Sequence, residues 1–463
     1  MVMNAMLTHS SFPAQPYTVV LGLGQTGVSC ARYLKREGLN FVLADTRSEP
    51  PGLAALAVEF EEVPMYLGAI DPGLFAGASK VVVSPGLAPS EPAVAAASAG
   101  SAPLLTDIDL FCASATAPII GITGSNAKST VTTLVGLMAK RAGLRVSVGG
   151  NLGTPALDIL ARDTEIYVLE LSSFQLEYSA SLPLSTACLL NVTPDHLDWH
   201  GSADAYRDAK QKIFSGTESA VFNRADALTL PVSSFPKSRV GFGLDAPTVA
   251  IEFGLLADAD GREWLARGSE KLILVDALAM VGRHNVANAL AALAIGSCAG
   301  LSMEAMLEEL RYFAGLPHRG ELVATRAGVR WINDSKATNV GATLAALEGL
   351  SGSGSDRGRV ILIAGGQAKG AAFDELANAA QRHCRGVVVL GEAAAQLEAA
   401  LRGKVETVHA MTMSAAVQCA AEMARTGDVV LLSPACASFD MFDGFAARGT
   451  AFIGSVDDLG GTS

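Results

Sequence analysis

The sequence predicts an α/β protein of three domains, each built on a mostly parallel sheet covered by helices. Short apolar runs that end in glycine, such as "TVVLGLG", "PIIGITG" and "RVILIAGG", alternate with amphipathic stretches along the chain. Continuous apolar runs indicate strands buried on both faces, as in parallel sheets, and right-handed crossovers connect such strands. The 463 residues correspond to roughly two to four domains of ordinary size.

Two boundaries separate the predicted domains, because each precedes a fresh series of strand and helix patterns. One lies near Thr106, before "DIDLFCASATAP", and the other lies near Gly315, in "FAGLPHRG". We therefore expect an N-terminal Rossmann-like domain, a central P-loop ATPase-like domain and a C-terminal Rossmann-like domain. Their predicted ranges are 1–106, 107–315 and 316–463.

Composition narrows the function classes. Half of the residues are hydrophobic and only 17% are charged, which predicts large buried cores. The net charge of −12 argues against a nucleic-acid partner, so any anionic ligand must be held by local devices. The seven cysteines form no C-x-x-C pair and indicate reduced thiols. Without a signal-peptide pattern or an apolar run of membrane-span length, we expect a cytoplasmic monomer with no membrane insertion.

The stretch "GITGSNAKST", residues 121–130, partly matches the phosphate-binding pattern G-x-x-x-x-G-K-[ST]. Lys128 and Ser129 occupy the expected positions, whereas Ile122 and Ala127 replace the two glycines. An apolar strand precedes this stretch and a helical pattern follows it. At such a turn, free backbone N–H groups and the helix dipole favour phosphate. We therefore predict an ATP site with Mg²⁺ near Ser129, with a plain strand-to-helix turn as the alternative.

Ala127 is a physical departure from that pattern. Glycine at this position permits a positive φ, which costs alanine on the order of 1 kcal/mol. A site with many phosphate contacts tolerates such a cost. We expect a slower or more selective loop, not an inactive one.

A second glycine-rich turn, "GLGQTG" at Gly22 to Gly27, follows the first predicted strand. Asp45 ends the second strand, where an acidic residue meets a ribose hydroxyl in dinucleotide sites. Taken alone, this pattern favours NAD(P). Many Rossmann-like domains bind other nucleotides or none, so the alternative stays open.

Further polar residues fall at predicted strand ends. Glu170 ends "IYVLELSS", Asp195 and His196 follow "TACLLNVTP", and Lys210 lies on the next helix. Carboxylate and imidazole groups near a phosphate loop suit a metal that holds a nucleotide. The alternative is a hydrogen-bonded polar rim, with Lys210 as a solvated surface lysine.

The C-terminal part carries more groups of this kind. Asn285 and Asn288 share one face near the start of a predicted helix, where they contact a nucleotide or cap the helix. His318 and Arg319 follow the second predicted domain boundary. Other polar residues stand at predicted strand ends and indicate a substrate rim. They are Asp334, Ser335, Lys336, Thr338, Lys369 and Ser438.

Together, these motifs resemble the Mur ligase family over nearly the whole chain. The resemblance rests on "VVLGLGQTG", "GITGSNAKST", "GGNLGTPAL", "LELSSFQLE", "NVTPDHLDWH", "GLPHRGE", "WINDSKATNVGAT" and "LLSPACASFDMF", in family order. "NDSKATN" with "SPACAS" is the specific pair, since the phosphate loop alone also fits folylpolyglutamate synthetase-like enzymes. The resemblance implies ATP-dependent ligation of D-glutamate to UDP-N-acetylmuramoyl-L-alanine through an acyl phosphate, in peptidoglycan precursor synthesis.

The resemblance also implies roles for individual residues. The UDP-linked substrate would contact Thr26, Asp45, Thr46, Arg47, Ser84, Gly86, Asn151, Ser172 and Gln175. ATP would contact Gly124, Ser125, Asn126, Ala127, Lys128, Ser129, Thr130, Asn285, Asn288, Arg319 and Asp334. Glutamate would contact Lys336, Thr338, Lys369, Ser438 and Phe445.

Catalysis and metal binding are implied for a smaller group. The catalytic residues would be Lys128, Lys210, His196 and Glu170. The ligands of Mg²⁺, of which two ions are implied, would be Ser129, Glu170, His196 and Lys210 as a CO₂-derived carbamate. Formation of a carbamate turns the lysine cation into an anion, which accounts for a lysine at a position where a metal site ordinarily has a carboxylate.

Departures from the family pattern put ligand affinity in doubt but not the class of reaction. "GGQAKGAAF" carries Gln367, Ala368 and Ala372 at unusual positions, and Phe439 stands where leucine is usual. Two other functions remain as alternatives: an NAD(P) oxidoreductase, and a binding or regulatory protein with a degenerate phosphate loop.

Overall fold

The computed structural model describes residues 12–13, 16–179, 181–232, 236–280, 282–350 and 358–459. Three sheets form its framework, and the chain divides into two compact units. The first unit lies mainly before residue 258, and the second lies mainly after residue 309. No helix in the described ranges is long and apolar enough to cross a membrane.

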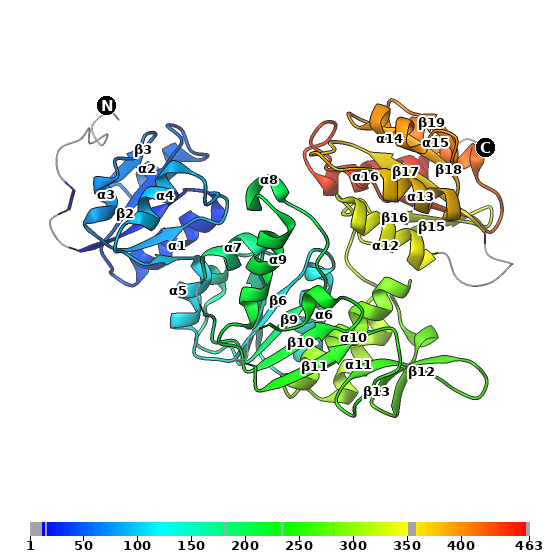
Figure 1. Ribbon diagram of the computed structural model, residues 1–463, viewed down its shortest axis with the longest axis horizontal. Helices are drawn as coiled ribbons and strands as arrows, with labels where there is room; N and C mark the ends of the chain where they lie inside the picture. Colours follow the sequence, from blue (N-terminus) through cyan, green and yellow to red (C-terminus); the bar gives the residue numbers. More distant parts are fainter. Residues whose placement is uncertain are drawn as a thin grey trace. The chain divides into compact units, whose positions relative to one another are not determined.

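The first sheet is fully parallel, with strand order β3-β2-β1-β4-β5 (Figure 1). Its strands are β1 Tyr17–Leu21, β2 Phe41–Asp45, β3 Met65–Leu67, β4 Ala78–Val83 and β5 Leu104–Leu105. Its helices are α1 Gln25–Arg36, α2 Leu53–Glu59, α3 Gly73–Ala76 and α4 Pro92–Ala99. The "GLGQTG" turn lies between β1 and α1, as predicted. A Cβ on Gly27 would lie 1.9 Å from the Gly22 carbonyl oxygen, so only glycine permits this close packing.

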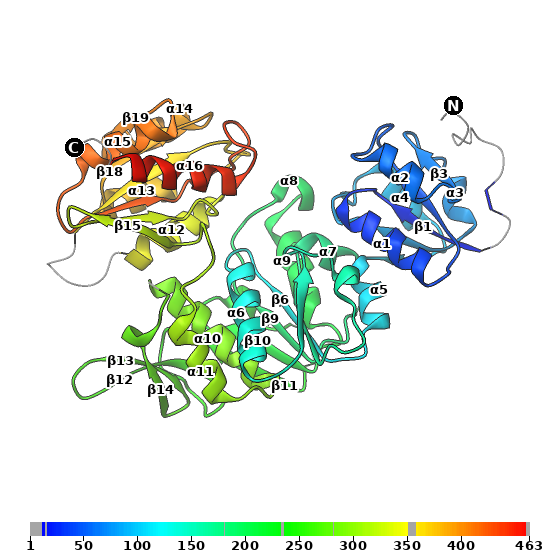
Figure 2. The same cartoon turned by 180° about the vertical axis from the view of Figure 1, so that it is seen from behind.

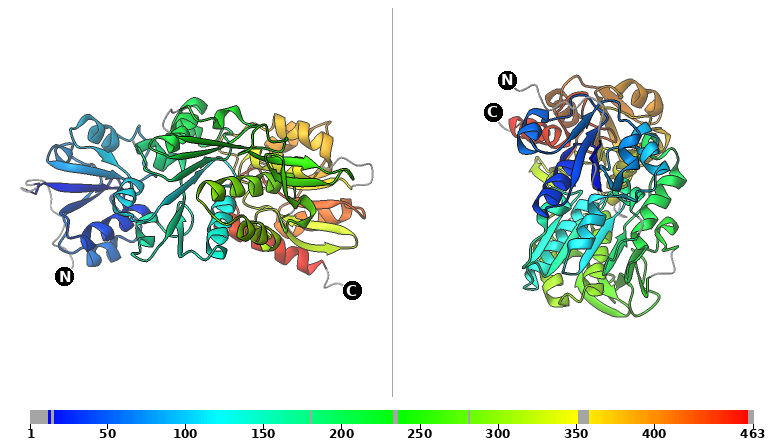
Figure 3. Two further views of the ribbon diagram at one scale, coloured as in Figure 1. Left: turned by 90° about the horizontal axis from the view of Figure 1, so that it is seen from below. Right: turned by 90° about the vertical axis from the view of Figure 1, so that its left-hand side faces the viewer.

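The second sheet has nine strands in the order β14-β13-β12-β11-β10-β9-β6-β8-β7. Figure 3 gives two further views of the ribbon, in which the residue colours identify this part of the chain. The run from β7 to β12 is parallel. Its strands are β6 Ile119–Thr123, β7 Val146–Gly150, β8 Ile166–Glu170, β9 Thr186–Leu189, β10 Ser219–Asn223, β11 Ser238–Phe242, β12 Phe253–Ala257, β13 Glu263–Arg267 and β14 Glu270–Leu274. The strands beside the phosphate loop are fully buried, as their continuous apolar sequences predict.

Helices of this part include α5, which starts at the predicted boundary. Thr106 caps α5 because its hydroxyl accepts from the amides of Ile108 and Asp109, while the Asp109 carboxylate accepts from the Thr106 amide. The α-helices are α5 Asp107–Ser114, α6 Lys128–Arg141, α7 Ser173–Tyr178, α8 Leu197–His200, α9 Ala203–Gln211, α10 Arg283–Cys298 and α11 Met303–Tyr312. Short 3₁₀ turns are η1 Ala156–Ile159, η2 Lys212–Phe214, η3 Ala227–Thr229 and η4 Val275–Ala277.

The third sheet has the order β15-β16-β20-β17-β18-β19. Its strands are β15 Glu321–Arg326, β16 Val329–Asn333, β17 Val360–Gly365, β18 Cys384–Leu390, β19 Glu406–His409 and β20 Val429–Leu432. All neighbours are parallel except β15, which pairs antiparallel with β16 at the edge. This departure from a purely parallel sheet arises because a short turn connects β15 directly to β16, without a crossover helix.

Helices cover both faces of the third sheet (Figure 2). One face packs against α12 Val340–Leu350, α13 Asp374–His383 and α14 Ala394–Leu401. The other face packs against α15 Met413–Met423 and α16 Phe445–Asp458. The predicted α/β class with mostly parallel sheets is confirmed for all three parts of the chain.

Arg448, on α16, is a buried cation at the centre of the third sheet's carboxyl edge. Only 2% of it is exposed, and burial lowers the pKa of its guanidinium to about 10. It donates to Oγ and the carbonyl of Ser335, which follows β16, and to the carbonyl of Gly365 at the end of β17. It also donates to the carbonyls of Cys436 and Ala437, after β20. One side chain therefore holds three loops together.

We predict that Arg448→Met lowers the stability of the C-terminal part by at least about 2 kcal/mol, because several buried acceptors lose their donor. Thermal unfolding measures this loss. The control is Arg326→Met, which removes an arginine that is paired with Asp457 at the surface of the same sheet. Equal melting temperatures for the two variants would contradict the role of Arg448.

Candidate active site

The predicted phosphate loop lies between β6 and α6, and the loop after β9 holds it in place. The Ser125 amide donates to the Asn191 carbonyl at 3.0 Å, and the Asn126 amide donates to the Asn191 side chain at 2.8 Å. Ser125 Oγ also donates to the Thr193 carbonyl at 2.9 Å. Ala127 adopts φ 65°, the left-handed conformation that glycine would adopt at this position. The unusual residue therefore keeps the loop geometry at the cost of strain.

Two lysines converge on one carbonyl oxygen of this loop. Lys128 Nζ donates to Gly124 O at 2.8 Å and to Ser125 O at 3.0 Å. Lys210 Nζ, from α9, donates to the same Gly124 O at 2.9 Å. Lys210 is 1% exposed, so its interpretation as a solvated surface lysine is wrong.

Burial lowers the pKa of the Lys210 amine well below its usual value, and the charge of Lys128 lowers it further. Asp195 and Glu170 act in the opposite sense on the same pKa but do not outweigh burial. The amine also lies 4.6 Å from the centre of the Tyr206 ring, one turn earlier on α9. Burial therefore favours the uncharged, nucleophilic form of the Lys210 amine over its charged form.

Glu170, at the end of β8, supplies a buried carboxylate next to these lysines. Its Oε1 accepts from Asn151 Nδ2 at 2.7 Å, whereas Oε2 is buried without a hydrogen-bond partner among the described residues. A buried acceptor of this kind fits a cation, because a magnesium ion prefers oxygen ligands. Among the described residues, no group of three His, Cys, Asp or Glu side chains is close enough to hold a metal. Further oxygen ligands of a magnesium ion would come from other groups, such as water, hydroxyl groups, a modified lysine or phosphate.

His196 begins α8 in the left-handed conformation, with φ 52°. Its ring lies 4.9 Å from that of Phe174, and its Nε2 lies 3.8 Å from Asp195 Oδ2. Partial burial and the charges of Lys128 and Lys210 lower the pKa of His196, although Asp195 opposes the shift. The imidazole is therefore neutral near pH 7, which is the form that binds metals.

His200, which the sequence interpretation did not single out, links the same elements. Its Nε2 lies 3.0 Å from Ser173 Oγ on α7, and its ring packs against Phe174 and Tyr206. Burial and the charge of Lys210 lower the pKa of His200 to about 4. A neutral, packed imidazole here fixes α8 against α7 and α9.

The predicted substrate residues of α7 form a capping box. Ser172 Oγ accepts from the Gln175 amide at 3.2 Å, and Gln175 Oε1 accepts from the Ser172 amide at 3.0 Å. Gln175 Nε2 donates to both carboxylate oxygens of Asp107, at 3.1 and 3.3 Å. Because its amide is satisfied within the protein, Gln175 positions Ser172 and the start of α7. Asp107 was missed because no local pattern marks it.

In the first domain, Asp45 binds protein groups with both oxygens. Oδ2 accepts from the Leu23 amide and Arg47 Nη2, each at 2.7 Å, and Oδ1 accepts from the amide and Nε of Arg47. Burial raises the pKa of this carboxyl, but the hydrogen bonds of Arg47 and Leu23 lower it more. Asp45 thus fixes the glycine-rich turn and Arg47. This arrangement disfavours the NAD(P) reading, in which Asp45 accepts from a ribose.

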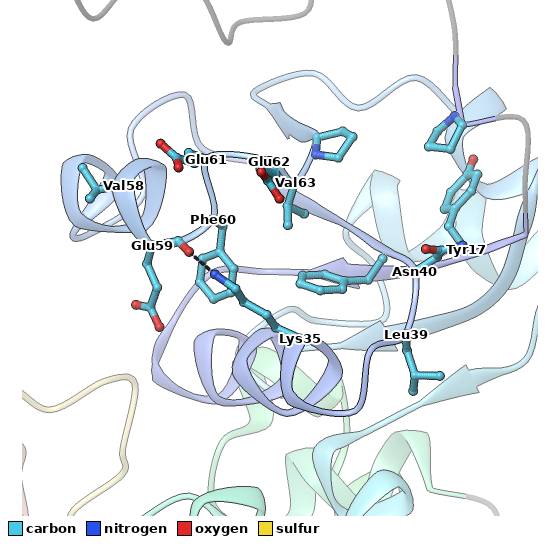
Figure 4. A pocket seen from close by; sticks show the side chains of 13 residues that line it. Tyr17, Lys35, Leu39, Asn40, Val58, Glu59, Phe60, Glu61, Glu62 and Val63 are labelled. Atoms are coloured by element: carbon cyan, nitrogen blue, oxygen red, sulfur yellow. Dashed lines mark hydrogen bonds between the residues drawn. The ribbon is translucent and has the colours of Figure 1, made fainter.

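The remaining predicted residues of this domain lie at the carboxyl edge of the sheet. Thr26 lies in the first turn of α1, Thr46 follows β2, and the Ser84 amide donates to the Leu21 carbonyl at 2.8 Å. Gly86 is exposed in the loop after β4. A hollow of about 680 Å³ lies at the opposite, amino end of these strands, beside Tyr17, Phe41 and Pro64 (Figure 4). It contains none of the predicted ligand residues.

The second unit holds the predicted glutamate residues at the carboxyl edge of the third sheet. Lys336 Nζ lies 3.9 Å from the centre of the Phe445 ring, and Lys369 Nζ lies 5.7 Å from that of Phe439. Ser438 is buried, and Thr338 is exposed. Each ring holds an ammonium group within cation–π range.

The predicted ATP residues of the second unit are also hydrogen-bonded. Asn288 Nδ2 donates to Asn285 Oδ1 at 3.0 Å near the start of α10. Asp334 accepts from the Gly320 amide at 3.2 Å and from Ser433 Oγ at 2.9 Å. Burial raises the pKa of Asp334 to about 7, although these hydrogen bonds oppose the shift.

The fold and the site are those of a nucleotide-binding α/β protein, in which two lysines donate to one carbonyl oxygen of a strand-to-helix loop. Comparison with family models identifies the family. A Mur ligase MurD-like N-terminal domain matches residues 16–105, a Mur ligase middle domain matches 122–296, and a Mur ligase glutamate ligase domain matches 318–436.

Relatives match along almost the full chain. Proteins from Pseudomonas aeruginosa and Marinobacter nauticus, both named UDP-N-acetylmuramoylalanine–D-glutamate ligase, are 50% and 49% identical. Each alignment covers 96% of this chain and 98% of the relative. The chain belongs to the Mur ligase family.

Solved structures share the fold at low sequence identity. The MurF ligase of Thermotoga maritima in complex with ADP has a TM-score of 0.60 at 16% identity, covering 96% of both chains. A pseudomurein peptide ligase type C from Methanothermus fervidus has a TM-score of 0.58 at 18% identity, covering 96% of this chain and all of that one.

We predict that Ala127→Gly stabilises the central part by about 0.5–1 kcal/mol, because it removes left-handed strain. The melting temperature should rise by about 1–3 °C. The control is Ala142→Gly at the other end of α6, where φ is −71° and glycine brings only added chain entropy. A fall in melting temperature for Ala127→Gly as large as that of the control would contradict the strain.

Proposed function

We propose that this chain joins D-glutamate to UDP-N-acetylmuramoyl-L-alanine, converting ATP to ADP and phosphate. The observation that carries the proposal is the pair Lys128 and Lys210 on Gly124 O, in a phosphate loop whose departures keep its geometry. The names of relatives that are about half identical over nearly the full chain supply the substrates.

The reaction needs an activated carboxylate, because a carboxylate and an amine do not condense unaided in water. An oxygen of the alanyl carboxylate bonds to the γ-phosphorus of ATP, while the bond between that phosphorus and the β–γ bridging oxygen breaks and ADP leaves. The amine nitrogen of glutamate then attacks the acyl carbon. The amide forms, phosphate leaves, and the amine gives up a proton to solvent.

Lys128 would supply a positive charge for the terminal phosphates. Its ammonium group donates to the Gly124 and Ser125 carbonyls, close to the start of α6. The backbone N–H groups at this helix start and the Lys128 charge together suit the charge that spreads over a transferring phosphoryl group. Ser125, Asn126, Ala127, Ser129 and Thr130 complete the proposed phosphate contacts.

Glu170, His196 and Ser129 would hold magnesium, and two ions are proposed. Bound magnesium would neutralise phosphate charge during transfer. We also propose that the Lys210 amine carries a carbamate, because a buried, uncharged amine bonds to the carbon of CO₂ with loss of one proton. The resulting anion supplies the further oxygen ligands that the described carboxylates and imidazoles do not.

The three proposed domains, over residues 1–106, 107–315 and 316–463, would each supply one ligand platform. The first would hold the UDP group through Thr26, Thr46, Arg47, Ser84 and Gly86, with Asp45 positioning Arg47. Asn151 and Ser172 would contact the muramoyl part. The third would hold glutamate through Lys336, Thr338, Lys369, Ser438 and Phe445, and ATP through Arg319 and Asp334. Asn285 and Asn288, in the second, would also contact ATP.

The proposed setting follows from the substrates. ATP and a nucleotide-linked precursor place the reaction in the cytoplasm, within peptidoglycan precursor synthesis. We propose a monomer without a nucleic-acid or membrane partner, since one chain provides all the proposed ligand residues.

We predict that ADP and phosphate are released over many turnovers only when ATP, magnesium, UDP-N-acetylmuramoyl-L-alanine and D-glutamate are all present. Lys128→Ala should lower turnover at least about 100-fold, because the transferring phosphoryl loses a charge partner. Lys140→Ala, an exposed lysine of the same helix, is the control and should match wild type. Phosphate release without glutamate, or full activity of Lys128→Ala, would contradict the proposal.

We further predict that Lys210→Ala loses most of its activity and that added short-chain carboxylic acids restore part of it. The acid would occupy the cavity left by the side chain and replace the missing anion. Steady-state rates with and without acetate measure the rescue. If acetate stimulates wild type and variant equally, or neither of them, the carbamate assignment fails.

A further inference from the structure

At the carboxyl edge of the third sheet, a β-bridge between Gln367 and Ala437 joins two loops. We call the backbone of these two bridged loops the floor. The Gln367 amide donates to the Ala437 carbonyl at 2.9 Å, and the Ala437 amide donates back to the Gln367 carbonyl at 3.0 Å. The loop after β17 is thereby joined to the loop after β20. Buried Arg448 binds carbonyls of both loops.

Two glycines of the floor pack so closely against neighbouring backbone that no side chain could be accommodated at either position. Gly365 and Gly366 adopt φ of 135° and 126°. A Cβ on Gly365 would lie 1.8 Å from the Leu390 carbonyl oxygen, and one on Gly366 would lie 2.1 Å from that of Ala437. The backbone path is therefore fixed immediately before Lys369, and the residues after the bridge project from a stable base.

Lys369 and Phe439 project from the two joined loops and meet outside the floor. Lys369 is exposed and adopts φ 49°, a conformation that lysine seldom adopts without a local reason. Its ammonium group lies 5.7 Å from the centre of the Phe439 ring and has no carboxylate partner among the described residues. The Phe439 side chain is itself 67% exposed.

Lys369 is thus a cation without a carboxylate partner among the described residues, although the chain as a whole has a net charge of −12. The ring of Phe439 attracts the ammonium group without neutralising it, whereas a carboxylate partner would compete with an anionic ligand. An aromatic ring that is two-thirds exposed also offers an apolar surface to the methylene groups of such a ligand.

We propose that Phe439 is a positioning residue that holds the Lys369 ammonium group ready for a carboxylate of the incoming glutamate. This inference rests on the proposed ligation of glutamate and assigns a role to the phenylalanine that stands where leucine is usual. The ring restricts the flexible lysine stem before glutamate binds, so less side-chain freedom is lost on binding. Phe439 therefore contributes to affinity for glutamate and not to phosphoryl transfer.

The test measures KM for D-glutamate and kcat in two substitutions of Phe439. Phe439→Leu keeps an apolar side chain but removes the ring, and should raise KM about two- to fivefold, the range of an exposed cation–π contact. Phe439→Trp keeps an aromatic face and should leave KM at or below the wild-type value. In both variants, kcat and the KM for UDP-N-acetylmuramoyl-L-alanine should stay at wild-type values, which a general loss of structure would not permit.

A second background shows whether Phe439 acts through the lysine. In Lys369→Gln protein, adding Phe439→Leu should change KM by less than its effect in wild type, because no ammonium group remains to be held. The inference is overturned if Phe439→Leu leaves the KM for D-glutamate unchanged, or if Phe439→Trp raises this KM as much as Phe439→Leu does. It is also overturned if Phe439→Leu raises this KM by the same factor in Lys369→Gln protein as in wild type.

The outcome for wild-type protein separates this inference from the proposed function. If wild type forms no ADP with D-glutamate, the proposed function fails and this inference fails with it. If wild type ligates glutamate and Phe439→Leu has an unaltered KM, only the role of Phe439 fails.

Discussion

Two lysine side chains share one carbonyl oxygen, and the rest of the site depends on how their charges are accommodated. Lys128 and Lys210 both donate to Gly124 O, one from the start of α6 and the other from α9. Two ammonium groups this close repel each other by several kcal/mol even at an effective dielectric constant of about 20. Burial and the charge of Lys128 both lower the pKa of the Lys210 amine, which favours its uncharged form beside the Lys128 cation. One carbonyl oxygen thus accepts from a lysine proposed to bind phosphate and from a lysine proposed to react with CO₂.

Buried side chains that are not proposed to contact a ligand hold in place the residues that are. Asp107 fixes Gln175 and so the start of α7, and Asp45 fixes Arg47. Arg448 performs the same task in the second unit, where it joins the loops that carry the proposed glutamate residues. Hydrogen bonds to charged groups in a dry interior are strong and directional, so each loop keeps one conformation before ligands arrive. This preorganisation lowers the cost of ordering the site when a substrate binds.

The sequence predicted the fold class, the strand-to-helix context of the phosphate loop and the placement of Glu170 at a strand end, because apolar runs and glycine turns are local signals. It also anticipated the φ that Ala127 adopts. The sequence interpretation missed the burial of Lys210, since a helical lysine is usually solvated. Tyr206, four residues earlier on the same helix face, is buried as well and was the one local signal for it. Asp107, His200 and Arg448 act across long stretches of chain, and no spacing rule reveals such partners.

The most direct test of this account is carbon-13 NMR of the protein equilibrated with labelled bicarbonate and magnesium. We expect one protein-bound carbamate resonance, present in wild type and in Lys140→Ala and absent in Lys210→Arg, whose guanidinium group cannot take up CO₂. An active wild-type protein without a bound carbamate resonance would contradict the account. So would an unchanged resonance in Lys210→Arg.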